Sequence, residues 1–238
     1  MALLDDAVNA SGGLDQWRRL RRFACHISIQ GSLLARSGAA AHLKDAVAEG
    51  CTQTPWVRLV GFGGADKCAV YRPGRVSIEG LDGTLLEARD DPRAALLGRD
   101  GPASWDDLDV AYICGLSIWN FIATPFLLTN PGVEVEELPA WRERGETWGR
   151  LRAEFSSDIE TFCAQQVFYF DAAGLQRRTD YEIAGVAGFK LVHYSWAHQD
   201  FSDIVIPTLR QSLLVQPDGA VIARPAFMDV EIFDASFE

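Results

Sequence analysis

Short segments in which apolar and polar residues alternate fill most of the chain, and this pattern restricts its fold more than any other feature. In ACHISIQ, Cys25 and Ile27 alternate with His26 and Ser28. A period of two places alternate side chains on opposite faces of a half-buried β-strand, and we expect His26 on the exposed face. The pattern predicts a large, mainly antiparallel sheet. Similar segments recur at 56–62, 67–73, 75–80, 84–89, 133–138, 146–155, 165–170, 175–183, 189–198, 206–215 and 227–233.

One long segment, SWDDLDVAYICGLSIWNFI, breaks this alternation. Ser104, followed by Asp107 three residues later, predicts a helix that begins near Ser104, and Pro125 closes it. Ser117 and Asn120 interrupt the apolar run, so we predict a buried helix and no membrane span. The residues at helical spacing are 108, 111, 112, 115, 116 and 119.

The chain has 238 residues, enough for one sizeable core, and no linker or repeat divides it. We predict a single domain over 1–238, of the α+β class and mainly antiparallel β, in which a curved open half-barrel is wrapped around the central helix. Such a sheet leaves a pocket between sheet and helix. We also expect a short helix at 12–20, a surface helix at 38–50 that contains His42, and a type I′ turn at Asp82-Gly83.

Charge and cysteine content exclude several classes of partner. With 33 acidic and 22 basic side chains the net charge is -11, which repels nucleic acid and anionic membranes. The N-terminal segment lacks the apolar run of a secretory signal, so we expect a cytoplasmic protein. The five cysteines lack paired spacing, which disfavours a disulfide framework and a zinc site. No nucleotide-binding glycine motif and no G-x-S-x-G elbow occurs, and we predict no metal and no cofactor.

Polar residues in the segment LQRRTDYEI are the first candidates for a functional site. A hairpin loop at DAAG would place Phe168 opposite Arg177 and Gln166 opposite Thr179. Arg177, Thr179 and Tyr181 would then share the face of Phe168, so the segment predicts that they line the cavity rather than the surface.

On the next predicted strand, His193 is the inward group that titrates near neutral pH. We assign it the role of general acid or base, with Tyr181 and Arg177 stabilising negative charge. A hydrogen-bonded core histidine is the alternative. The residues expected to line the ligand pocket are Thr179, Gln166, Phe162, Phe168, Leu151, Phe155, Trp119 and Tyr112.

The order of helix, strands, central helix and closing strands resembles the outer-membrane lipoprotein carriers LolA and LolB, half-barrels that hold acyl chains between a curved sheet and helices. In addition, RDDPRAALLG, SWDDLDVAYICG, GETWGRLRAEF and QQVFYFDAAGLQRRTDYEI are similar to an uncharacterised family of cytosolic bacterial proteins, over nearly the whole chain. The pattern of that family has histidines where this chain has Phe162 and Thr179, and a third at His193. Because only His193 is kept, the resemblance disfavours a transition-metal site.

Two functions are compatible with these observations. The first is a cofactor-independent enzyme, an isomerase, cyclase or lyase, whose substrate is a hydrophobic small molecule held against the central helix. The second is a binding protein or carrier for a lipid-like or polyketide-like ligand. We favour the enzyme, because a polar cluster inside an apolar cavity costs stability unless it is paired or used.

Overall fold

The computed structural model describes residues 2–34, 43–97, 99, 104–183 and 190–238. Within these residues one sheet has the strand order β6-β5-β4-β3-β2-β1-β14-β12-β11-β10-β9-β8-β7, with β13 beside β12, and the neighbouring strands are antiparallel. The strands are β1 (Arg22–Gln30), β2 (Ala46–Cys51), β3 (Val57–Val60), β4 (Lys67–Arg72), β5 (Arg75–Gly80), β6 (Leu85–Asp90), β7 (Val133–Glu143), β8 (Glu146–Phe155), β9 (Gln165–Phe170), β10 (Gln176–Glu182), β11 (Lys190–Phe201), β12 (Ile204–Val215), β13 (Val221–Ile222) and β14 (Met228–Phe237).

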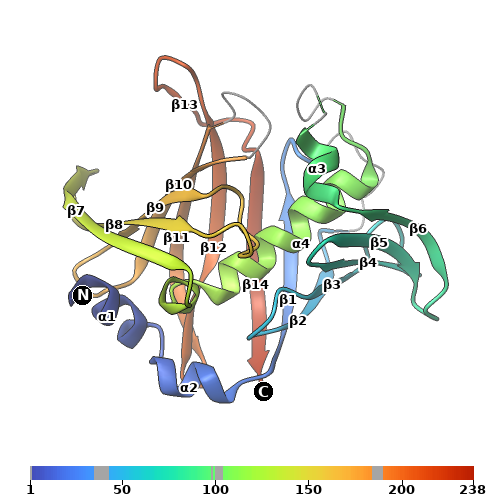
Figure 1. Cartoon of the computed structure of the whole chain (residues 1–238), viewed down its shortest axis with the longest axis horizontal. Coiled ribbons are helices and arrows are strands. Elements are labelled where there is room, and N and C mark those ends of the chain that lie inside the picture. The colour runs from blue at the N-terminus through green and yellow to red at the C-terminus, as the bar shows by residue number, and fades with distance from the viewer. Residues whose placement is uncertain (1, 35–42, 98, 100–103, 184–189) are drawn as a thin grey trace.

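Figure 1 shows this sheet curving from β7 on the left to β6 on the right, with one long helix lying across it. The predicted half-barrel around a central helix is therefore confirmed. None of the helices that the structure describes is both long and apolar enough to span a bilayer. The helices are α1 (Ala2–Ala10), α2 (Leu14–Arg19), α3 (Pro92–Leu97), α4 (Asp107–Ala123) and the 3-10 helix η3 (Phe126–Thr129).

Helix α4 is the core of the molecule. Every residue of α4 except Asp107 is buried, as expected of a helix that is apolar on all sides. The helix packs against β3, β4 and β5. Its C-terminal part reaches the other half of the sheet, where the rings of Phe121 and His193 stack with centroids 4.4 Å apart. The two halves of the half-barrel are thus joined through α4.

The start of α4 differs from the prediction. Asp106, not Ser104, is the N-cap residue, and its side chain accepts a hydrogen bond from the backbone N–H of Asp109 at 3.0 Å. The Asp109 carboxylate accepts in return from the backbone N–H of Asp106 at 3.1 Å. Both D-x-x-D and S-x-x-D fit a capping box, and the choice falls on Asp106 because Arg89 on β6 pairs with it at 2.7 Å.

Two local predictions are wrong for reasons of sheet pairing. The expected helix at 38–50 is replaced over Ala46–Cys51 by β2, which pairs with both β1 and β3; His42 lies outside the described residues. The Asp82-Gly83 turn is not type I′, because only Gly83 has a positive φ, at 86°. The hairpin instead closes through the backbone N–H of Gly80, which donates to Thr84 at 2.8 Å.

Helix α4 lies tightly against β4 at Gly115, where an added Cβ would lie 2.4 Å from the Cβ of Tyr71. We expect Gly115→Ala to lower the free energy of unfolding by about 1 to 2 kcal/mol, because overpacking outweighs the gain in helix propensity. Chemical denaturation measures the change. At Gly149 the added Cβ would meet only the flexible end of Leu3, at 2.7 Å. Gly149→Ala is therefore the control. An equal loss of stability in this variant would show that the contact between α4 and β4 does not cause the loss in Gly115→Ala.

Candidate functional site

A buried polar cluster lies on the concave face of the sheet, beneath the C-terminal part of α4. It comes from four adjacent strands, β9 to β12, and all its members are buried. Four of the predicted site residues, Gln166, Thr179, Tyr181 and His193, are among them, although the sequence did not indicate how they are connected. The cluster consists of Gln166, Gln176, Thr179, Tyr181, His193, Ser195, Arg210 and Ser212.

The register of β10 differs from the prediction by a bulge. Phe168 pairs with Thr179, and the register shifts between Gln176 and Arg178. Arg177 is therefore turned away from the interior, and its guanidinium lies 3.6 Å from Glu146. The prediction that Arg177 lines the cavity is wrong because Arg177 is itself the extra residue of the bulge, whereas Thr179 and Tyr181, which follow it, point inward as predicted.

His193 occupies the predicted inward position, opposite Thr179 on β10. Its Nδ1 lies 2.8 Å from the hydroxyl of Ser212, and its Nε2 lies 3.4 Å from Nη1 of Arg210. Because a guanidinium only donates, Nε2 accepts, and the proton is on Nδ1, which donates to Ser212. Burial and the charge of Arg210 hold the pKa of His193 well below its ordinary value. The imidazole is therefore neutral, with both nitrogens occupied.

Arg210 is the member of the cluster that sequence reasoning missed. Its Nη2 donates to the backbone carbonyl of Phe121 at 2.8 Å, and its Nη1 donates to Ser195 at 3.3 Å. Its Nε is buried without a partner. Burial lowers the pKa of Arg210 to about 9, so the guanidinium stays charged at neutral pH. The signal in the sequence was the run Thr208, Arg210, Ser212, whose period of two places three polar groups on one face.

A cavity of about 20 Å³ lies against this cluster, which is room for about one water molecule. Two amide atoms in its wall, Nε2 of Gln166 and Oε1 of Gln176, have no hydrogen-bond partner. The ring of Phe162 stacks on Tyr181 at 4.5 Å and closes one side. The lining residues are Asn120, Phe121, Thr124, Phe162, Gln166, Phe168, Gln176, Thr179, Tyr181 and His193.

Four of the predicted lining residues do not reach this cavity. Leu151 and Phe155 are buried in the packed core beside it. Trp119 points to the other half of the sheet, where its indole N–H donates to the carbonyl of Cys51 at 3.1 Å. Tyr112 packs against Tyr71. Side chains of α4 thus fill most of the space in which a pocket was expected.

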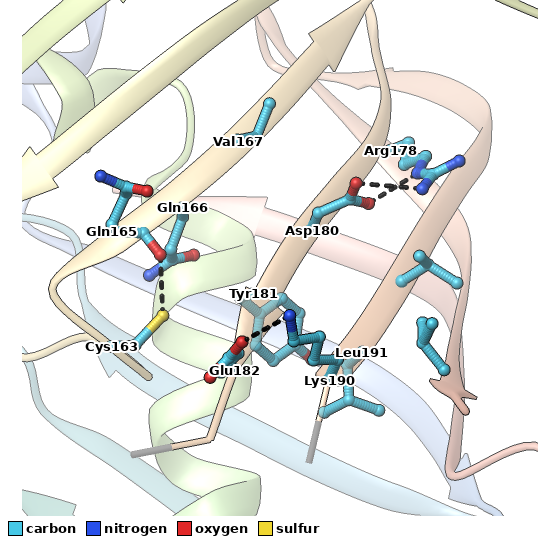
Figure 2. A pocket seen from close by; sticks show the side chains of 12 residues that line it. Cys163, Gln165, Gln166, Val167, Arg178, Asp180, Tyr181, Glu182, Lys190 and Leu191 are labelled. Atoms are coloured by element: carbon cyan, nitrogen blue, oxygen red, sulfur yellow. Dashed lines mark hydrogen bonds and ion pairs between the residues drawn. The ribbon is translucent and has the colours of Figure 1, made fainter. Parts of the chain in front are cut away.

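A larger pocket of about 540 Å³ opens at the surface next to the cavity (Figure 2). Glu182 and Lys190 pair at 3.2 Å at its edge, between the adjacent strands β10 and β11. Gln166 and Tyr181 line both this pocket and the internal cavity. These two side chains therefore stand between the surface pocket and the internal cavity.

Metal ligands do not gather here. Over the ranges that the structure describes, no group of three or more His, Cys, Asp or Glu side chains could hold a metal ion. His193, beside the charged Arg210, would have to lose the hydrogen bond at its Nε2 before it could bind a cation. That the protein needs no metal or cofactor stays a prediction.

The buried His193 and the half-buried His198 predict how stability depends on pH. Burial lowers the pKa of His193 well below 6.5 and that of His198 to about 4. Between 6.5 and these values the unfolded chain binds protons that the folded chain does not, so stability is lost as the pH falls below 6.5. We expect a slope of about 1.4 kcal/mol per pH unit for each histidine. Urea denaturation from pH 7 to 5 measures it, and an unchanged slope in His193→Gln would contradict this assignment.

No protein-family model matches the chain, and no curated protein matches it in sequence. Among solved structures it is similar to a DUF1329 family protein from Desulfovibrio piger, at 12% identity and a TM-score of 0.52. It is likewise similar to a LolA superfamily protein from Nitrosomonas europaea, at 8% identity and a TM-score of 0.52. Each likeness covers 100% of this chain and 92% of the other. At such identities the likeness concerns the fold alone, and the chain has a LolA-like fold.

Proposed function

We propose that the protein binds a hydrophobic small molecule between the concave face of the sheet and α4, as a binding protein or carrier. The observation that carries the proposal is the cavity beneath Phe121, which adjoins a surface pocket through Gln166 and Tyr181. Ligand sites combine apolar walls with convergent polar groups, and here the rings of Phe121, Phe162 and Phe168 stand beside the polar side chains of the cluster. The resemblance to LolA and LolB implies an acyl chain in the same place.

The arrangement supports binding better than catalysis. Of the three residues expected to act on a substrate, Arg177 lies outside the cavity. Both nitrogens of His193 are engaged by Ser212 and Arg210. The hydroxyl of Tyr181 lies 3.5 Å from Ser212, and burial raises its pKa. A general acid or base must reach the substrate with its proton position, and in the closed protein Ser212 and Arg210 occupy both positions of His193.

Uptake requires a rearrangement, because a cavity of about 20 Å³ cannot hold an acyl chain. We infer that the C-terminal part of α4 moves away from β9 to β12, while its N-terminal end stays anchored to β6 through Arg89 and Asp109. Each methylene of the ligand that takes the place of an α4 side chain contributes about 0.8 kcal/mol to the free energy of binding. The apolar surface of the sheet that α4 uncovers is covered again by the apolar ligand. The net free-energy cost of opening therefore stays small.

Native mass spectrometry of the protein purified gently from its own host tests the proposal. We expect an added mass corresponding to one amphiphilic molecule per chain. Denaturation, solvent extraction and refolding should remove that mass, and this sample is the control. A chain that carries no ligand, and that binds neither fatty acids nor fatty alcohols after refolding, would contradict the proposed function.

A further inference from the structure

The buried charge of Arg210 has no counter-charge in the part of the chain that the structure describes. Among the described residues, no carboxylate forms an ion pair with it, and its acceptors are neutral: the carbonyl of Phe121, the hydroxyl of Ser195 and the imidazole of His193. The nearby thiol of Cys25 is neutral as well, because burial raises its pKa to about 12. A buried charge without a partner is costly, and proteins normally pair it.

Other buried charges in this protein are paired. The Asp109 carboxylate, which is fully buried, binds Arg89 at 2.6 Å and Arg99 at 2.9 Å. The largely buried Arg178 binds Glu143 at 2.5 Å and Asp180 at 2.6 Å. Arg210 is buried as deeply as these residues, yet no carboxylate among the described residues pairs with it.

The position of Phe121 connects Arg210 to the ligand cavity. The carbonyl of Phe121 accepts the shortest hydrogen bond of the guanidinium, at 2.8 Å, and its ring lies 4.7 Å from the guanidinium carbon. The same residue lines the cavity. If the C-terminal part of α4 moves outward, Phe121 withdraws from Arg210, and the guanidinium then faces the enlarged cavity with donors at Nη2 and Nε free. The unpartnered amide of Gln166 supplies a further donor in the cavity wall.

We propose that the ligand carries an anionic head group, a carboxylate or a phosphate, which replaces the carbonyl of Phe121 on Arg210. This inference rests on the proposed function and specifies its ligand class. In the closed protein the partial negative charge of a carbonyl occupies the place of the ligand oxygen. In the complex a full negative charge neutralises Arg210, and a guanidinium binds carboxylate and phosphate in two-pronged geometry.

The test compares three amphiphiles with the same sixteen-carbon chain: palmitate, hexadecyl phosphate and hexadecanol. Each competes with one fluorescent fatty alcohol for the refolded, ligand-free protein. We expect the wild-type protein to bind at least one anion about 10- to 100-fold more tightly than hexadecanol. The tighter of the two anions identifies the head group as carboxylate or phosphate. Equal affinity for anion and alcohol would overturn the inference and leave the proposed function intact.

Arg210→Met removes the charge at nearly constant volume, and Arg210→Lys keeps the charge without the planar geometry. The methionine variant should lose the preference for the anion while its affinity for hexadecanol stays within about threefold. The lysine variant should keep part of the preference. A preference that persists in Arg210→Met would contradict the role of Arg210. The comparison of anion with alcohol in the wild type stands without either variant, should one fail to fold. If none of the three amphiphiles binds, the proposed function fails and the inference with it.

Discussion

Replacing Asp109 by alanine should lower the free energy of unfolding by about 3 to 5 kcal/mol, because it removes the central partner of a buried ion network. The Asp109 carboxylate is fully buried, accepts hydrogen bonds from Arg89 and the backbone N–H of Asp106, and forms an ion pair with Arg99. Its loss leaves two guanidinium groups of positive charge beside a single remaining carboxylate, and it breaks the capping box. The Arg89 hydrogen bond holds the pKa of Asp106 well below its usual range, whereas burial raises the pKa of Asp109.

Asp107→Ala is the matched control for this experiment. It removes the same charge from the same turn of α4, but Asp107 is the one residue of the helix that is not buried. We expect a change within about 0.5 kcal/mol, as is usual for surface substitutions. Guanidinium denaturation followed by tryptophan fluorescence measures both variants. If the two lose equal stability, helix N-terminal charge accounts for the effect and the buried network does not anchor α4.

Truncating Phe168 to alanine should also cost about 3 to 5 kcal/mol, since it leaves a large void in the core. Phe168 is buried and lines the internal cavity, so the void joins the space in which we place the ligand. Palmitate at saturating concentration should therefore raise the unfolding midpoint of Phe168→Ala more than that of the wild type. A molecule that binds only the folded state stabilises it in proportion to its affinity.

The neighbouring Tyr169 provides the control. It is buried to the same extent as Phe168 but lies on the opposite face of β9, packed against Trp148. Tyr169→Ala should lose comparable stability, and palmitate should shift its midpoint no more than it shifts the wild type. Equal rescue of both variants by palmitate would place the ligand elsewhere than between the sheet and α4.

The sequence was sufficient for the architecture because alternation along the strands and helical spacing at 104–122 are strong signals. It was insufficient where pairing between strands decides the outcome. The residues from 46 onward belong to the Ala-rich stretch 38–50, which favours a helix locally, yet hydrogen bonding to β1 and β3 makes Ala46–Cys51 a strand. The bulge in β10 shifts Arg177 outward, and nothing in the hairpin loop DAAG indicates an extra residue.

Arg210 was missed for a related reason. On β8, β9, β11 and β12 some outward side chains are buried as well, because they form an outer apolar cluster on the convex side. Apolar residues therefore occupy both faces, and alternation no longer distinguishes inside from outside. On β12, Leu213 belongs to the outer cluster, whereas Arg210 and Ser212 point inward. The outer cluster consists of Trp148, Tyr169, Val192, Tyr194, Leu213 and Ala226.

Photo-crosslinking with a palmitate that carries a diazirine in mid-chain tests the central claim most directly. The fatty acid is bound to the ligand-free protein, irradiated, and the labelled peptides are identified by mass spectrometry. We expect labels on α4 and on the inward residues of β9 and β10, above all Phe121 and Phe168, and we expect unlabelled palmitate to compete them away. Labels confined to the convex face, around Trp148 and Tyr194, would contradict binding between the sheet and α4.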